Sequence, residues 1–326
     1  MENRHIEAIV GQLHHQLGVD VTNAVDVFDC IRRLEVYLHF RPLKNLMGAY
    51  LNPDGRTPGI LINSKHPLQL QRYTAAHELG HFWLNHEPTT DAVIGVSSDD
   101  AGFTQMGQEE RDAELFAALF LMPSELVAHC ATKIGIDPHG HNQVSNEEVL
   151  MLSLLLGTSY KATTNRIRSL GLIDADYRAM LQKRQPQDIK KAVGGFKPEG
   201  LVDHKITWNH VVVMDARSHS SSVLLEPDQV VQICLDTRAT SGHIWECASA
   251  PEGVQIHWST QRLAAPDVIG AGVRNVFTIV GMRPEVFILR FIERRPWQPE
   301  RIRNEYLVRI QVQHARRGID IGQLVC

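Results

Sequence analysis

The first 184 residues carry apolar side chains mainly at helical spacing. Recurrence every three or four positions predicts helices over residues 6–17, 24–34, 68–86, 108–122, 149–156, 160–170 and 176–182. The pair Ser145 and Glu148 is a capping box just ahead of the helix at 149–156. Short apolar runs at 36–40 and 59–63 predict two strands, and the polar stretch around 89–102 predicts a loop. We therefore expect one α+β domain over residues 1–184.

The pattern changes after residue 184. Proline, glycine and lysine dominate residues 185–204, which we interpret as an interdomain linker. Apolar runs then predict short strands over residues 211–214, 223–225, 230–235, 276–280, 286–292 and 306–312. In the last run the apolar Tyr306, Val308 and Ile310 occupy every second position, and this period of two is typical of a half-buried strand. We expect a second, all-β domain over residues 205–326, built as a small sandwich.

Composition narrows the class of protein. Of 326 residues 43% are hydrophobic and 21% charged, which excludes wholesale disorder. The net charge of −4 argues against a general nucleic-acid binder. The chain shows no apolar N-terminal leader and no apolar run near the roughly 18 residues of a membrane span. Its five cysteines form no Cys-x-x-Cys pair, so we expect a cytoplasmic protein with reduced thiols and no membrane partner.

The 17 histidines are unusually many, and one pair has the spacing of metal ligands. His77-Glu78-Leu79-Gly80-His81 lies within a predicted helix, where positions four apart face the same way. Two imidazoles placed so can bind one zinc ion, with Glu78 beside the metal as a base for bound water. The alternative is an amphipathic helix with surface histidines.

A catalytic zinc site of this type needs a third protein ligand and an open position. The helix predicted at 108–122 offers Glu110, which heads an apolar stripe formed by Ala113, Ala117, Phe120 and Leu121. A carboxylate on an apolar face is costly unless it is paired or metal-bound. The alternative is an acidic first turn that complements the helix dipole, and it accounts better for Glu109 than for Glu110.

Two stretches resemble the ImmA/IrrE family of zinc metallopeptidases. They are residues 72–81, followed by His86, and residues 110–123, which begin Glu110-Arg111-Asp112-Ala113 and end Met122-Pro123. The resemblance covers about residues 1–184 and implies a zincin-like α+β fold with Glu110 as third zinc ligand. It also implies an endopeptidase that cleaves a helix-turn-helix repressor in stress, mobile-element or phage-defence settings. Glu114 stands where this family often has Asn.

The peptidase hypothesis assigns a role to Glu78 and leaves two other details open in the sequence. Glu78 would deprotonate the attacking water and then protonate the leaving amine. The group that stabilises the oxyanion is unidentified, and His86, His139 and His141 are the nearest candidates by position. The strand at 59–63 could pair with an extended substrate peptide or serve only as a structural strand.

Three loops between the predicted C-terminal strands stand out. They are Thr240-Ser241-Gly242, the loop from Gly270 to Gly272, and Arg295-Pro296-Trp297. Taken one at a time, each loop is explained by turn chemistry. In this order they resemble the three binding loops of chagasin-type cysteine-peptidase inhibitors, which implies an immunoglobulin-like sandwich over about residues 205–313.

The chagasin resemblance is incomplete. Arg238, Ala239 and His243 replace Asn, Pro and Tyr of the first loop, and Val273 replaces the last Gly of the second. We therefore interpret the β domain as a recognition or regulatory module for the protease, with a peptidase or regulatory protein as its possible partner. Two rivals remain: a protein-binding or inhibitor protein whose zinc is structural, and a sensor that binds DNA directly, which the lack of basic stripes disfavours.

Overall fold

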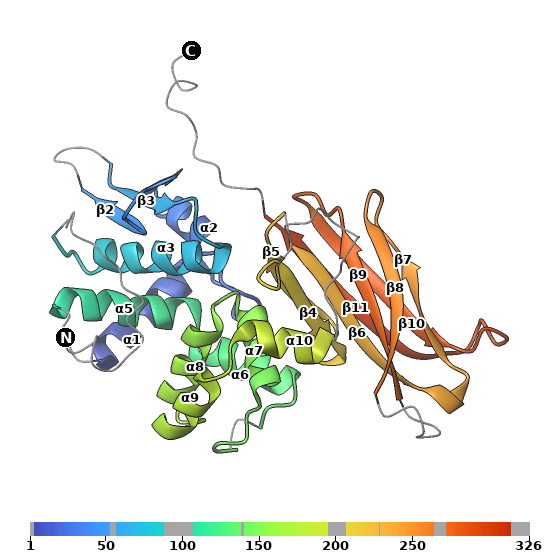
Figure 1. The fold of residues 1–326 in the computed structure, drawn as a ribbon. Helices are drawn as coiled ribbons and strands as arrows, with labels where there is room; N and C mark the ends of the chain where they lie inside the picture. The colour runs from blue at the N-terminus through green and yellow to red at the C-terminus, as the bar shows by residue number, and fades with distance from the viewer. Residues whose placement is uncertain are drawn as a thin grey trace, which may run out of the picture. The chain divides into compact units, whose positions relative to one another are not determined.

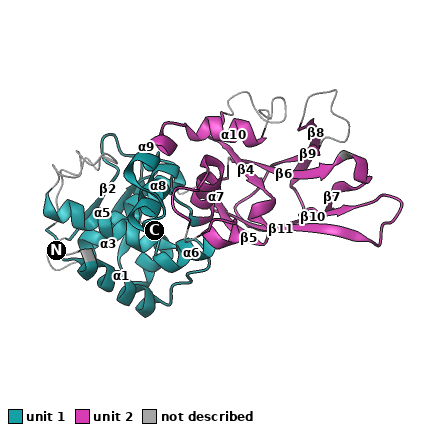
Figure 2. Ribbon diagram, turned by 90° about the horizontal axis from the view of Figure 1, so that it is seen from below, with its two compact units in different colours: residues 1–130, 156–178, 316–326 teal, residues 131–155, 179–315 magenta. Residues whose placement is uncertain are grey.

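The computed structural model describes residues 3–52, 57–87, 107–137, 140–194, 207–227, 229–263 and 272–313. Figure 1 shows their helices and strands in chain order. The chain divides into two compact units, one built from residues 1–130 and 156–178 and the other from 131–155 and 179–315 (Figure 2). Residues 131–155 thus belong to the same unit as the C-terminal strands. The domain ranges expected from the sequence stay a prediction.

The first unit combines helices with a small mixed sheet. Its sheet has the order β1-β3-β2, with β3 parallel to β1 and antiparallel to β2. The three strands are β1 (Tyr37–Arg41), β2 (Gly48–Leu51) and β3 (Gly59–Asn63). The helices are α1 (Asn3–Leu17), α2 (Val27–Arg33), α3 (Leu68–Trp83), α5 (Gln108–Leu121) and α8 (Tyr160–Ser169), while α6 (Ser124–Lys133) and α9 (Ala175–Gln182) cross its boundaries.

The strand predicted at 59–63 is confirmed as β3, but one idea about it is wrong. Because β1 and β2 occupy both of its edges, β3 has no free edge for an extended peptide. The outer strand β2, which the sequence analysis did not predict, lies beside α3 instead. Strand β2 has only four residues, which are too few to show the alternation of apolar and polar positions that predicts a strand. Gly48 also separates its apolar side chains from the preceding loop.

Helices α3 and α5 pack tightly against one another and form the core of this unit. Gly80 makes their close approach possible, since a Cβ there would lie 3.2 Å from both the Cα of Ala113 and the Phe116 ring. The start of α3 is held by Arg72, whose buried guanidinium donates to the carbonyls of Gly157 (3.0 Å) and Val25 (2.8 Å). These contacts fix the position of α3 along α5.

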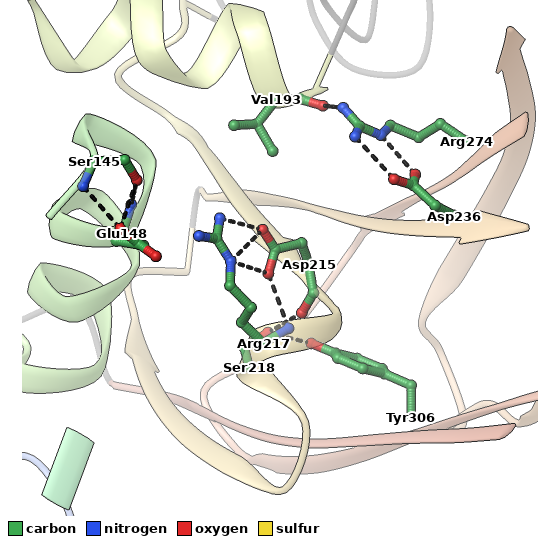
Figure 3. Close-up of polar contacts among 9 residues, drawn as sticks. All are labelled: Ser145, Glu148, Val193, Asp215, Arg217, Ser218, Asp236, Arg274 and Tyr306. Carbon is green, nitrogen blue, oxygen red and sulfur yellow. Dashed lines mark hydrogen bonds and ion pairs between the residues drawn. The ribbon is translucent and has the colours of Figure 1, made fainter. Parts of the chain in front are cut away.

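The second unit contains two four-stranded sheets, ordered β5-β11-β10-β7 and β4-β6-β9-β8. Phe277 of β9 and Phe291 of β10 meet between the sheets, with ring centroids 4.6 Å apart. The buried Tyr306 hydroxyl and Ser218 Oγ, 2.6 Å apart, form a hydrogen bond in this interior (Figure 3). The strands are β4 (Val211–Asp215), β5 (Ser221–Leu225), β6 (Val230–Arg238), β7 (Ile244–Ser249), β8 (Gln255–Arg262), β9 (Gly272–Val280), β10 (Val286–Arg294) and β11 (Ile302–Val312).

Two helices accompany these sheets. In α7 (Asn146–Leu156) the predicted capping box is confirmed: Ser145 N donates to Glu148 Oε2 (2.8 Å) and Glu148 N to Ser145 Oγ (3.2 Å; Figure 3). Helix α10 (Pro186–Gly194) lies within the stretch interpreted as a linker. Proline in the first turn and glycine at the end are compatible with a short helix, which the composition did not indicate.

Helix α10 packs on the strands of the second unit. Val193 and Trp208 cover a buried cluster formed by Val211, Val213, Cys234 and Val276. Arg274 donates from Nη1 to the Val193 carbonyl (2.8 Å) and from Nε and Nη2 to Asp236 (2.8 and 3.1 Å; Figure 3).

No single helix in the described ranges is long and apolar enough to cross a bilayer, although α5 and α6 together meet the criterion across a bend of 44°.

Candidate metal centre

Helices α3 and α5 bring the three predicted ligands together. His77 Nε2 lies 3.0 Å from His81 Nε2 and 3.3 Å from Glu110 Oε2, while His81 Nε2 lies 3.5 Å from Glu110 Oε1. The two histidines are buried because one turn of α3 places both rings on the face that packs on α5. Among the described residues, this is the one group of three whose geometry fits a metal ion. We call these three residues the metal centre.

The spacing of the metal centre agrees with a zinc ion. An ion bound tetrahedrally at about 2.0–2.1 Å separates its ligand atoms by about 3.3 Å. The three separations in the metal centre, from 3.0 to 3.5 Å, lie around this value. Two imidazole nitrogens and one carboxylate are also the donor set of catalytic zinc sites, so the residues present fit the ion.

Glu78 lies beside the metal centre, deeply buried. Its Oε1 has no hydrogen-bond partner among the described residues. Burial raises the pKa of Glu78, and the charges of His77 and His81 and the backbone N–H of Tyr50 only partly oppose this effect. A carboxylate with a raised pKa and a free oxygen can accept a proton from water and return it to a leaving group.

The charged groups of the metal centre strongly affect the pKa values of His77 and Glu110. Hydrogen bonds from His77 and His81 hold the pKa of Glu110 far below its usual range. Burial by itself lowers the pKa of His77, but the hydrogen bond to Glu110 and the charges of Glu78, Glu114 and Glu110 together raise it above the usual value. The three groups therefore favour a positive charge between them, whether a proton or a metal ion.

A second carboxylate, Glu114, lies one turn beyond Glu110 on α5. The hydroxyl of Tyr73, one turn before His77 on α3, donates a short hydrogen bond to Glu114 Oε2. Burial raises the pKa of Glu114, and the nearby charge of His77 opposes this. The sequence pattern gives Tyr73 no role of its own. Its position four residues before His77 is the signal that could have linked it to the site.

The three oxyanion candidates lie in different places. His86 turns back onto His81, with their Nδ1 atoms 3.1 Å apart. His141 is exposed and belongs to the second compact unit. His139 lies outside the described residues. The group that would stabilise an oxyanion stays open.

Strand β2 lies beside the metal centre and was missed by sequence reasoning. A Cβ added to Gly48 would lie 3.3 Å from Glu78 Oε1 and 2.7 Å from the Leu61 carbonyl, so β2 lies directly against the carboxylate of Glu78. The backbone N–H of Tyr50 also donates a hydrogen bond to Glu78, which lowers the pKa of that carboxyl. A glycine just after the loop at 42–47 was the available signal.

Two of the three predicted loops of the β domain meet. Arg295 Nε donates to the Ser241 carbonyl (3.2 Å), and the Trp297 ring lies over Gly242, where an added Cβ would be 2.6 Å from Trp297 Cη2. Trp297 is 67% exposed. Residues 239–241, which include Thr240, form a 3-10 turn, and Pro296 begins the turn after β10. We call Thr240 to Gly242 with Arg295 to Trp297 the loop surface.

The loop from Gly270 to Gly272 is described only in part. Gly272 begins β9 and pairs with Arg238, the residue at the end of β6 just before the turn of the loop surface. Gly270 lies outside the described residues. His243, at the position of the family's tyrosine, turns its Nδ1 to within 3.0 Å of the Ser241 carbonyl.

Comparison with known families identifies both parts of the chain. Residues 31–150 match the family model of the IrrE N-terminal-like domain, Peptidase_M78. Residues 225–312 match that of the chagasin family of peptidase inhibitors, I42. Both resemblances predicted from the sequence are thereby confirmed, and the C-terminal part is a chagasin-like β domain. The first match supports a peptidase, and the His-His-Glu group supports a metal site within it.

Solved structures resemble only about a third of the chain, and distantly. No curated protein matches it. The cysteine protease inhibitor EhICP2 from Entamoeba histolytica aligns at 9% identity over 32% of this chain and 96% of its own, with a TM-score of 0.29. Amebosin aligns at 20% identity over 32% and 98%, with a TM-score of 0.27. PbICP-C, solved in complex with falcipain-2, aligns at 15% identity over 34% and 96%, with a TM-score of 0.24.

Proposed function

We propose that this chain is a cytoplasmic zinc-dependent endopeptidase with a zincin-like catalytic domain and an immunoglobulin-like recognition domain. The observation that carries the proposal is the convergence of His77, His81 and Glu110 beside the buried base Glu78. The match to a peptidase family over residues 31–150 supports it. Structural zinc sites usually need no buried general base next to the metal, so the placement of Glu78 favours catalysis.

In this mechanism the protein's own residues hold the water and move its proton. His77, His81 and Glu110 would hold the zinc ion, which supplies Lewis-acid polarisation and lowers the pKa of water. Glu78 accepts the proton at its free Oε1 and then donates it to the nitrogen of the leaving amine. Burial raises the pKa of Glu78, which favours both transfers.

Strand β2 would align the substrate with Glu78. Met47 accepts a hydrogen bond from Asn63 N (2.8 Å), and Ala49 lies opposite Leu61, so by the alternation of an antiparallel ladder the backbone groups of Gly48 and Tyr50 point away from β3. Among the described residues no further strand pairs with this edge, which lies beside the metal centre and whose Tyr50 N–H already donates to Glu78. An extended peptide that paired with this edge would place its carbonyls next to Glu78.

The substrate in this proposal is a regulatory protein, and a helix-turn-helix repressor is the first candidate. Its cleavage would derepress genes in a stress, mobile-element or phage-defence setting. The loop surface would recognise that substrate or a regulatory partner, since an exposed tryptophan next to arginine is a common contact hot spot.

A second function has one observation in its favour. The chagasin-family match over residues 225–312 is also consistent with a protein-binding or peptidase-inhibitor protein whose zinc is structural. That function needs the loop surface but no proton transfer by Glu78, so the two functions differ in what they require of one carboxylate.

The test is the Glu78→Gln variant of the full chain. We expect it to retain one zinc per chain by elemental analysis and to lose cleavage of a helix-turn-helix repressor encoded beside it. Glu109→Gln is the matched control, because Glu109 is exposed on α5 next to Glu110. Cleavage by Glu78→Gln at the wild-type rate would exclude the proposed role. Tight inhibition of papain by either variant would support the second function instead.

A further inference from the structure

His86 makes a specific contact with the metal centre. Its Nδ1 lies 3.1 Å from Nδ1 of His81, and the rings meet edge to face with centroids 5.1 Å apart. His86 is buried. The contact uses the nitrogen of His81 that faces away from His77 and Glu110, since Nε2 of His81 points at both.

The end of helix α3 builds this contact. Leu84 N still donates to the Gly80 carbonyl (2.9 Å), but Asn85 takes the left-handed conformation with φ 57° and ends the helix. The chain then reverses, and His86 N donates to the carbonyl of His81 itself (3.0 Å). Two hydrogen bonds therefore join His86 and His81, one between backbones and one between rings.

The ring contact dictates where the protons are. Only one of two neighbouring Nδ1 atoms can carry the shared proton. A histidine that offers Nε2 to a metal keeps its proton on Nδ1, so His81 must be the donor and His86 the acceptor. His86 then carries its own proton on Nε2. His77 differs from His81 in this respect. Nδ1 of His77 is buried with no hydrogen-bond partner among the described residues.

We propose that His86 is a positioning residue that holds His81 in the Nδ1–H tautomer and fixes its ring with Nε2 toward the metal. This role replaces the candidate role in oxyanion stabilisation. The inference rests on the proposed function in one respect: it takes the ion to be zinc. The two histidines of the metal centre then differ in their surroundings. Among the described residues, Nδ1 of His81 has an imidazole partner and Nδ1 of His77 has none.

Three substitutions of His86 separate positioning from packing. Asparagine can present its amide oxygen where Nδ1 of histidine lies, whereas glutamine reaches toward the place of Nε2 and leucine offers no acceptor. Loss of an outer partner of this kind weakens metal binding by roughly 10- to 100-fold. We expect that loss for His86→Leu and His86→Gln, and a change of less than about threefold for His86→Asn. His15→Leu, at an exposed histidine of α1, is the matched control.

Zinc dissociation constants, measured by competition with a chelator on the full chain, give the first readout. The second is the ¹⁵N spectrum of the His81 ring, recorded with and without zinc. We expect a slowly exchanging proton on His81 Nδ1 that couples to His86 Nδ1 and disappears in His86→Leu.

Three results would overturn the proposal: a His81 proton on Nε2 in the zinc-loaded wild type, wild-type zinc affinity in His86→Leu, or an equal loss in His86→Asn. If the wild type binds no zinc, both the proposed function and the role of His86 fail; if it binds zinc but its zinc-loaded spectrum places the His81 proton on Nε2, only the role of His86 fails. Because that spectrum is taken on the wild-type chain, it does not depend on whether a variant folds.

Discussion

Gly48 of β2 lies against the carboxylate of Glu78, and no larger residue fits there. A Cβ at position 48 would be 3.3 Å from Glu78 Oε1, 2.7 Å from the Leu61 carbonyl, and closer still to Cγ2 of Thr74. Because one of these neighbours is backbone of the adjacent strand, it cannot rotate aside. The contact therefore links the shape of the sheet edge to the position of the proposed base.

We expect Gly48→Ala to displace β2 and to lower kcat/KM for the repressor by at least tenfold. Overpacking of this kind costs about 1–3 kcal/mol of the free energy of unfolding. Zinc content should not change, since β2 provides none of the three ligands of the metal centre. Steady-state kinetics, thermal denaturation and elemental analysis of the same preparation measure these three effects.

Gly11→Ala is the control for this substitution. Gly11 lies in α1 with nothing within 4 Å of an added Cβ, so alanine there should stabilise the helix by about 0.5–1 kcal/mol and leave kcat/KM unchanged. Equal kinetics for the two alanine variants would show that β2 does not position Glu78.

Removal of the carboxylate of Glu110 should strongly weaken zinc binding. The Glu110 oxygens lie 3.3 and 3.5 Å from the two histidine nitrogens, so Glu110→Gln removes a ligand and not an outer partner. We expect the zinc dissociation constant to rise by more than the roughly 100-fold that loss of an outer partner produces. Chelator competition measures it, with Glu109→Gln as the neighbour whose affinity should stay at the wild-type value.

The sequence predicted most of the metal centre because helical spacing is a strong local signal. His77 and His81 had to share one face of a helix, and Glu110 had to lie on the buried face of its own helix. Their convergence required only that two apolar helix faces pack together, as α3 and α5 do. The apolar stripe that Glu110 heads singled out this residue, and the resemblance to a known family implied the same ligand.

The parts that sequence reasoning missed depend on tertiary structure. Strand β2 has four residues and gains its meaning from pairing with β3 and from contact with Glu78. His86 was weighed for a different role, because nothing local shows that the chain turns back after Asn85. Helix α10 was hidden by the proline and glycine at its ends, and its packing on Val211 and Val213 joins segments distant in sequence.

The contact between Tyr73 and Glu114 should be measurable as a coupling energy. Tyr73→Phe leaves a partly buried carboxylate without its donor, which we expect to cost about 1–3 kcal/mol of the free energy of unfolding. Glu114→Gln should cost less. In the double variant we expect a non-additivity of about 1–2 kcal/mol by urea denaturation. Additive losses would mean that the two side chains do not stabilise each other.

Lys190 should make stability depend on pH. Burial lowers the pKa of Lys190 to about 8, although its ammonium donates to the Trp208 carbonyl at 3.1 Å. Between about pH 8 and the ordinary lysine value near 10.4, the unfolded chain binds more protons than the folded one. The free energy of unfolding should therefore rise with pH across this window.

We expect Lys190→Met to remove that rise and to stabilise the second unit near pH 7, where the wild type must bury the charged form. Urea denaturation between pH 7 and 10 measures both effects. Lys191→Met is the matched control, since Lys191 is exposed and pairs with Asp188 at 2.9 Å. A wild-type curve that is flat across this window would show that the Lys190 ammonium is not buried in solution.

The loop surface should affect recognition of the protein substrate and not the chemistry of cleavage. Trp297 is exposed, and its ring is held over Gly242, whose φ of 66° an alanine tolerates poorly. We expect Trp297→Ala and Gly242→Ala to raise KM for the intact repressor by about 10-fold or more, the range of a tryptophan hot spot. Cleavage of a short peptide that spans the same bond should keep its wild-type kcat/KM, because such a peptide lacks the parts of the repressor that the loop surface would recognise. Trp258→Ala is the control: Trp258 is also exposed, but it lies on β8 and donates to Asn275 Oδ1 at 3.2 Å. If Trp258→Ala and Trp297→Ala have the same effect on both substrates, the loop surface is not the site of recognition.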